Sequence, residues 1–278
     1  MSSPTLTFWG AAGTVTGSRF LLETDSSRVL VDAGLYQGLR ELRQRNWDDL
    51  PVDPAGLDGV VLTHAHLDHC GYLPRLVRDG LAAPVLCTTE TAELAAIVLR
   101  DSARLQEEDA EYANQAGFSR HRPALPLYDE RDVEQTLPLL RPVPLHDGVP
   151  LTEDVTVTLR SAGHILGAAS VLVEAAGSTV LFSGDLGRPD HPLVPRRENP
   201  PAADVIVVES TYGDRTHPPR PTDPADDILA GAIGRTVARG GTVLIPAFAI
   251  DRTELVLLRV GELMSSGAVP TVPVYLDS

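Results

Sequence analysis

The sequence predicts a mixed α/β protein in two regions, and three observations support this. Val155–Leu159, Ala169–Glu174 and Thr179–Phe182 are short alternating or apolar runs, which is typical of antiparallel strands. Arg28–Asp32 is a short, mostly apolar run that predicts a buried strand. After about Asp214, helical and apolar segments alternate at the spacing of βαβ units, which predicts the start of a parallel sheet.

The first region is expected to begin with two short strands, Thr5–Trp9 and Arg19–Glu23, joined by a glycine-bearing turn. This turn is not a Walker loop, since no Gly-Lys-Ser/Thr follows it. Thr89 to about Gln115 is the longest predicted helix, because its apolar residues recur near a 3.6-residue period. The other expected elements of this region are a strand at Gly59–Thr63, a helix at Leu73–Asp79, a strand from Pro84 and a buried strand at Val205–Val208.

The second region follows a proline-rich linker, His217–Pro224. Its expected elements are a helix at Ala225–Arg239, a strand at Thr242–Pro246, a helix at Asp251–Ser265 and a strand at Val272–Leu276. The sequence stops directly after this last apolar strand, with no element to complete the sheet. We therefore expect the sequence to be a fragment of a longer chain.

Composition narrows the class of protein. The 278 residues are 43% hydrophobic and 22% charged, which excludes disordered and fibrous chains. No apolar run is long enough to span a membrane, and no signal peptide is present, so a cytoplasmic protein is expected. The two cysteines, Cys70 and Cys87, form no disulfide framework and are expected to be packed in the core. The net charge of −15 argues against a passive coat on nucleic acid but not against an enzyme with a local groove.

The strongest chemical signal is the run His64-Ala-His66-Leu-Asp68-His69, placed just after a predicted strand. Residues that leave a strand end can direct several side chains into one cleft. Three imidazoles and a carboxylate within six residues match the nitrogen and oxygen donors that Zn²⁺ prefers. The hexamer therefore predicts a zinc site.

Two further residues can complete this site. His164 lies in Ser-Ala-Gly-His between two predicted strands, and Asp185 lies in Phe-Ser-Gly-Asp after a third. Either one alone is more typical of a turn residue. We expect the loops after Thr63, Gly163 and Gly184 to meet at one edge of the sheets.

The combination of HAHLDH, SAGH and FSGD resembles the metallo-β-lactamase superfamily of zinc hydrolases. VESTYGDRTH, IPAFAIDRTELVL and PVYLDS are similar to the β-CASP branch, which contains nucleases related to the cleavage and polyadenylation endonuclease. The resemblance implies most of an αββα sandwich over residues 1–212, the N-terminal portion of a metallo-β-lactamase domain. It also implies that residues 213–278 are the first part of an inserted β-CASP α/β domain, incomplete here.

The resemblance also assigns residue roles. His64, His66 and His164 match the ligands of a first zinc, and Asp68 and His69 match ligands of a second. Asp185 matches the carboxylate that bridges the two zincs. Asp32 matches a residue that supports the ligand loop from behind. Glu209 matches the acidic motif that partners a later histidine. The resemblance makes Asp68 and Glu209 the expected catalytic residues.

The expected function is that of a ribonuclease in which a hydroxide activated by two zinc ions hydrolyses phosphodiesters of single-stranded RNA. The alternatives are a hydrolase of lactones, thioesters or β-lactams with the same fold, and a non-catalytic scaffold or an inactive fragment. The choice between RNA and DNA, and between endonuclease and exonuclease action, stays open. A homodimer is compatible with the sequence.

Overall fold

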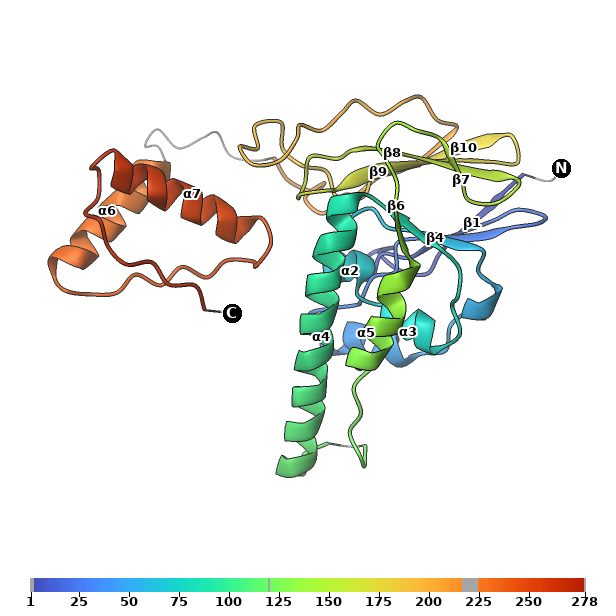
Figure 1. The fold of residues 1–278 in the computed structure, drawn as a ribbon, viewed down its shortest axis with the longest axis horizontal. Coiled ribbons are helices and arrows are strands. Elements are labelled where there is room, and N and C mark those ends of the chain that lie inside the picture. Colours follow the sequence, from blue (N-terminus) through green and yellow to red (C-terminus); the bar gives the residue numbers. More distant parts are fainter. Residues whose placement is uncertain (1–2, 120, 217–224, 278) are drawn as a thin grey trace. The chain divides into compact units, whose positions relative to one another are not determined.

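The computed structural model describes residues 3–119, 121–216 and 225–277. The chain divides into two compact units, Met1–Glu209 and Ser210–Ser278, each described here by itself (Figure 1). The predicted linker His217–Pro224 lies outside the described residues. In the described part, no helix has both the length and the apolar character needed to cross a bilayer.

The first sheet of unit Met1–Glu209 has six strands, arranged in space in their order along the chain. Strands β1 to β3 are antiparallel, whereas β3 to β6 are parallel. The strands are β1 (Thr5–Phe8), β2 (Phe20–Glu23), β3 (Arg28–Val31), β4 (Gly59–Val61), β5 (Val85–Cys87) and β6 (Leu140–Pro142).

The second sheet has five strands in the order β11-β10-β9-β8-β7. Only the β10–β11 pair is parallel; the other pairs are antiparallel, as the alternating sequence predicted. The strands are β7 (Val149–Pro150), β8 (Val155–Ser161), β9 (Ala169–Ala175), β10 (Ser178–Phe182) and β11 (Val205–Val207). The sequence predicted a buried strand at Val205–Val208, but Ile206 is 57% exposed because β11 is an edge strand with little packed on its sides.

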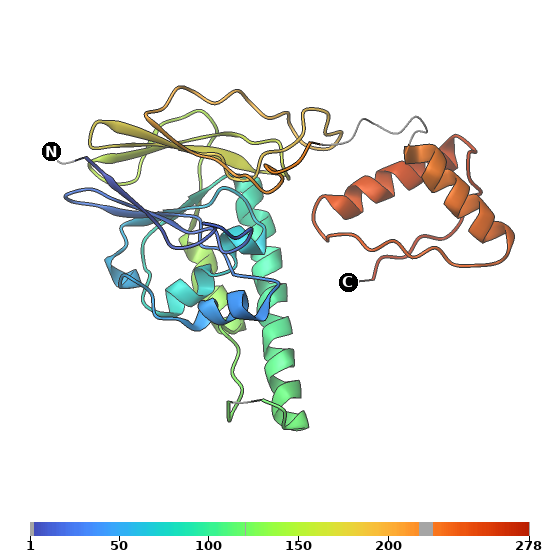
Figure 2. The same cartoon turned by 180° about the vertical axis from the view of Figure 1, so that it is seen from behind.

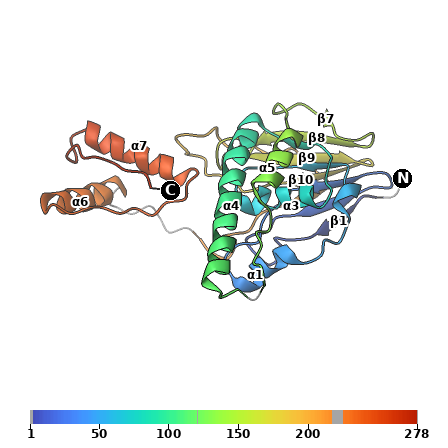
Figure 3. The ribbon, with the colours of Figure 1, turned by 60° about the horizontal axis from the view of Figure 1, so that its bottom comes forward.

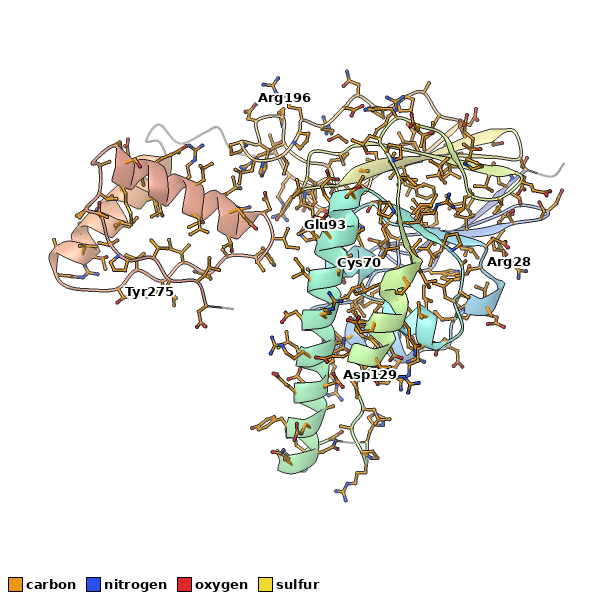
Figure 4. The ribbon with its side chains drawn as sticks, viewed as in Figure 1. Arg28, Cys70, Glu93, Asp129, Arg196 and Tyr275 are labelled. Atoms are coloured by element: carbon orange, nitrogen blue, oxygen red, sulfur yellow. The ribbon has the colours of Figure 1, made fainter. Side chains whose placement is uncertain are left out.

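The two sheets pack face to face (Figures 1 and 2). Their facing side chains form one core. In β8 every second residue is buried, as expected for a strand with one face on the core. Val29 and Val61 from the first sheet meet Val157 and Val171 from the second in this cluster. A second core lies on the other face of the first sheet and includes Cys70 and Cys87, both buried and unpaired as predicted (Figure 4).

The helices of this unit cover that other face of the first sheet (Figure 3). The long helix α4 begins at its N-cap Thr88, close to where the sequence predicted it. The implied sandwich has a second helix layer, which is not present among the described residues of this unit. The helices are α1 (Arg40–Gln44), α2 (Leu67–Cys70), α3 (Leu73–Arg78), α4 (Thr89–Ala116) and α5 (Glu130–Thr136), with 3₁₀ turns at Arg45–Trp47, Pro54–Gly56 and Leu137–Leu139.

Unit Ser210–Ser278 contains two helices, α6 (Ala225–Ala238) and α7 (Arg252–Ser265), as predicted. Its described residues form no strand, so the predicted strands Thr242–Pro246 and Val272–Leu276 are wrong for this structure. A strand of a parallel sheet needs at least one hydrogen-bonded neighbour, and such sheets are usually covered on both faces. Here Leu244 is 91% exposed and Tyr275 is 87% exposed, so these apolar segments have neither (Figure 4).

Candidate metal centre

Three chain segments meet where strands of the two sheets end. His64 lies shortly after β4, His66 is the N-cap of α2, His164 lies between β8 and β9, and Asp185 follows β10. The segments touch closely at Gly184, which has a φ of +55° and whose added Cβ would lie 2.9 Å from the Cβ of Thr63. The predicted convergence of these loops is therefore present in the structure.

His64, His66, His164 and Asp185 form the first metal group, in which one donor atom of each residue lies within 4.8 Å of the others. The Nδ1 atom of His66 is 3.1 Å from Nε2 of His64 and 3.2 Å from Nε2 of His164. The Oδ2 atom of Asp185 is 3.4 Å from Nε2 of His164 and 3.8 Å from Nε2 of His64. Donors about 2.0–2.1 Å from a tetrahedral ion lie about 3.3 Å apart, so these spacings fit one ion.

Protonation also suits metal binding in this group. Burial lowers the pKa of His64 well below its ordinary value, and the neighbouring imidazoles lower it further. Thr63 Oγ1 lies 3.0 Å from Nδ1 of His64 and donates to Asp32 at 2.9 Å, which assigns the ring proton to Nδ1. The neutral ring therefore presents an unprotonated Nε2 to the group, as a metal ligand must.

His69, Asp68 and Asp185 lie beside the first group and are candidate donors for another ion, the second metal group. The Nε2 atom of His69 is 3.3 Å from Oδ1 of Asp185 and 4.0 Å from Oδ2 of Asp68. Asp185 thus directs one carboxylate oxygen to each group, which is the geometry a bridging ligand needs. Two of these three residues belong to the short helix α2.

The carboxylates dominate the electrostatics around His69. Burial alone would lower the pKa of His69, but Asp32 and Asp185 outweigh it, and the pKa is raised well above its ordinary value. Burial raises the pKa of Asp185, yet the hydrogen bond and charge of His69 outweigh this effect and lower it. Burial raises the pKa of Asp68. This concentration of carboxylates favours a cation at Nε2 of His69.

Asp32 lies behind the two groups, 1% exposed, directly after β3. Its Oδ1 accepts the backbone N–H of Thr63 at 2.8 Å, and its Oδ2 lies 2.7 Å from Nδ1 of His69. A carboxylate in this place fixes the ring orientation of a ligating histidine and leaves Nε2 for the metal.

Glu209 lies beside the loop that carries Asp185. Its Oε1 accepts the backbone N–H of Leu186 at 3.1 Å, and its own N–H donates to Ser183 Oγ at 3.0 Å. The structure therefore brings Glu209 to the Asp185 loop. The two hydrogen bonds hold its backbone and carboxylate against both ends of that loop.

The sequence analysis did not identify three residues that support the metal groups. Thr63 links His64 to Asp32, and Ser18 places Oγ 3.4 Å from Nε2 of His69. Thr88, the N-cap of α4, donates to the carbonyl of Gly167 at 2.7 Å and so holds the loop that carries His164. Serine and threonine are too common for any of these to stand out, although Thr63 adjoins the histidine run.

Comparison with known proteins agrees with this geometry. Residues 12–243 match the family model of the metallo-β-lactamase superfamily. A ribonuclease of Thermus thermophilus, TTHA0252, is 38% identical over 97% of this chain, and an RNase J-like protein of Methanocaldococcus jannaschii is 30% identical over 98%. The chain spans little more than half of these relatives, 57% and 58% of their lengths.

A solved structure supports the fold alone. The crystal structure of a protein of unknown function from Enterococcus faecalis covers 98% of this chain and 64% of its own, with a TM-score of 0.52 at 16% identity. The family match includes all the residues of both metal groups. The motifs, the fold and the family match together show that this chain belongs to the metallo-β-lactamase superfamily.

Proposed function

We propose that this protein is a zinc-dependent ribonuclease that hydrolyses phosphodiesters of single-stranded RNA. The observation that carries the proposal is the position of Asp185, whose two oxygens face two separate groups of metal donors. Relatives that are named as a ribonuclease and an RNase J-like protein support RNA as the substrate.

Zinc is the proposed metal because three imidazole nitrogens with a carboxylate oxygen, at tetrahedral spacing, match its preferences. When bound, two such ions would neutralise the phosphodiester charge and activate the attacking water. In the proposal His64, His66 and His164 hold the first ion, Asp68 and His69 hold the second, and Asp185 bridges them. Asp32 orients His69 from behind.

Two carboxylates are proposed to act in catalysis. Asp68 lies 4.0 Å from Nε2 of His69, at the edge of the second metal group, where its carboxylate can accept the proton of the attacking water. Glu209 is proposed to act at the leaving group. Its hydrogen bond to Leu186 supports this role, since it keeps Glu209 beside the Asp185 loop.

The proposal includes two features of the whole protein. Residues 213–278 are taken as the first part of a β-CASP domain. A homodimer is the proposed assembly, and light scattering on purified protein measures it.

The substitution Asp68→Ala tests the proposed chemistry. We expect it to reduce cleavage of a labelled single-stranded RNA by at least about 100-fold, the usual contribution of a positioned proton acceptor. Asp154→Ala is the matched control, since Asp154 binds hydroxyl groups of Thr24 and Ser26 and contacts no metal donor. Retained cleavage by the Asp68 variant, or cleavage that survives removal of metal by a chelator, contradicts the proposal.

Two further measurements on the same protein distinguish the ribonuclease from a small-molecule hydrolase and from a scaffold. Hydrolysis of a lactone, thioester or β-lactam without cleavage of RNA would establish a small-molecule hydrolase. Elemental analysis after dialysis gives the metal content, and a protein that retains no zinc would be a scaffold.

A further inference from the structure

The helix that carries Asp68 and His69 depends on outside backbone groups. Helix α2 has only four residues, so few of its own N–H groups reach its final carbonyls. Backbone N–H groups of two other segments bind them, from Leu35 to Leu67 at 2.8 Å, from Ser18 to Asp68 at 2.9 Å and from Ala33 to His69 at 2.7 Å. The orientation of the second metal group is therefore set by residue 18 and residues 33–35.

Gly34 brings these two segments into direct contact with α2. A Cβ added at Gly34 would lie 1.7 Å from the carbonyl oxygen of Asp68, so no other residue fits this position. The N–H of Gly34 donates to the carbonyl of Ser18 at 2.9 Å. Any movement of Gly34 would consequently be transmitted to Asp68.

Arg19 holds Gly34 from the other side. Its side chain is buried, with the residue 4% exposed, and its Nε donates to the Gly34 carbonyl at 2.7 Å. Its Nη2 donates to Oδ1 of Asn46 at 3.0 Å. Asn46 in turn binds the backbone N–H and C=O of Tyr36 at 2.9 and 2.8 Å. One guanidinium thus fixes both ends of residues 34–36.

The guanidinium is also stacked on aromatic rings. Its central carbon lies 3.6 Å from the ring centroid of Tyr72, just beyond α2, and 5.3 Å from that of Tyr36. No carboxylate pairs with Arg19 in the part of the chain that the structure describes. Burial lowers the pKa of Arg19 to about 10, so the group is still charged at neutral pH.

A buried charge without a carboxylate is costly, and an apolar side chain would fill the same space with less desolvation. The hydrogen bonds that the Arg19 guanidinium donates to Gly34 and Asn46 give a reason for a charged side chain at this position. We propose that Arg19 is a positioning residue for the second metal ion, because it clamps residues 34–36 onto the helix that carries Asp68 and His69. This inference rests on the proposed function, in which the site holds two zinc ions.

The clamp acts on one metal group more than on the other. In the first group, only His66 adjoins α2, as its N-cap. His64 and His164 lie on segments outside α2, near the ends of β4 and β8. Neither segment is hydrogen-bonded to Arg19, Gly34 or Asn46. Loss of the clamp should therefore weaken the second ion while the first is retained.

The test is a Zn²⁺ titration of the full chain against a chromophoric chelator, with the wild type binding two ions. Arg19→Met keeps the length and apolar contacts of the side chain but removes its charge and donors. We expect the second ion to bind about 10- to 100-fold more weakly, the usual effect of a partner that orients a ligand, and the first ion to change less than about twofold. Arg19→Lys keeps the charge over Tyr72 but not the planar fork, and should give a smaller loss at the second ion.

Arg78→Met is the matched control. Arg78 also donates to a backbone carbonyl, that of Leu127 at 3.2 Å, and its Nη1 lies 3.6 Å from Oδ2 of Asp132, but it does not contact the clamp. It should lower the unfolding midpoint without changing either zinc affinity.

Three results would overturn the inference. Equal weakening of both ions in the Arg19 variants, in proportion to lost stability, would show a purely structural role. Unchanged binding of both ions would show no role. A wild-type protein that binds fewer than two ions would refute the two-metal function itself and the inference with it. If Arg19→Met does not fold, the comparison of Arg19→Lys with the control still decides the question.

Discussion

Asp32 shows how a single residue serves both folding and the metal site. Its carboxylate accepts hydrogen bonds from the backbone and hydroxyl of Thr63 and lies 2.7 Å from His69 Nδ1. Asp32→Asn keeps the shape but replaces one carboxylate oxygen by an amide NH2 group, which cannot accept a hydrogen bond from these donors. The φ of Asp32 is +60°, which asparagine tolerates, so the backbone is not disturbed. We expect zinc binding to weaken about 10- to 100-fold and unfolding free energy to fall by about 1–3 kcal/mol.

Zinc competition and urea denaturation measure these two effects. Asp154→Asn is the control, because Asp154 accepts hydrogen bonds from Thr24, Ser26, Ser27 and Thr152 away from both metal groups. It should cost stability without changing zinc affinity. Equal zinc affinity in the Asp32 variant and the wild type would contradict the role assigned to Asp32.

At the scale of elements, the sequence predicted those helices, strands and site residues that depend on residues close together in the chain. Strands β8, β9 and β10 and helix α4 follow from periodicity, and α6 and α7 from the alternation of helical and apolar segments. The histidine run after β4 stands out because its donors are adjacent in sequence. The predicted strands Thr242–Pro246 and Val272–Leu276 failed because a strand forms only with a partner, which an apolar run does not specify. The Arg19 clamp was missed for a similar reason, since an arginine in sequence gives no sign of its burial.

The start of helix α4 provides a test at this scale. Thr88 Oγ1 accepts the N–H of Thr91 at 3.2 Å and donates to Gly167 at 2.7 Å, three residues beyond His164. Thr88→Val keeps the shape but loses both bonds, so we expect a stability loss of about 1 kcal/mol and weaker binding of the first zinc ion only. Zinc titration with urea denaturation measures both changes.

Asp129→Ala is the control for the helix start, since it removes the N-cap of α5 at a similar cost in stability without touching a metal loop. The control should leave both zinc affinities unchanged. If the Thr88 variant also left the first ion unchanged, helix α4 would have no part in positioning His164.

At the scale of the whole molecule, the two units have separate cores. Unit Met1–Glu209 contains two extensive clusters of buried side chains, on both faces of the first sheet. Unit Ser210–Ser278 has a small cluster, in which the buried members are Ile233, Val260, Leu263 and Val269. All the proposed metal ligands lie in the first unit. Metal binding should consequently stabilise one unit and not the other.

The sequence supplies a probe that separates the two units during unfolding. Both tryptophans, Trp9 and Trp47, lie in Met1–Glu209, so tryptophan fluorescence reports that unit alone, whereas circular dichroism reports helices of both. Because a ligand that binds only the folded state stabilises it, zinc at 100 times its dissociation constant should add about 2.7 kcal/mol per site to the first unit. The fluorescence melting temperature should therefore rise with zinc and fall with a chelator. A second, lower transition seen only by circular dichroism should stay fixed, since the smaller core unfolds more easily and holds no ligand. If the fluorescence melting temperature does not change with zinc, the first metal group, His64, His66, His164 and Asp185, holds no ion, even though its donor spacing fits one.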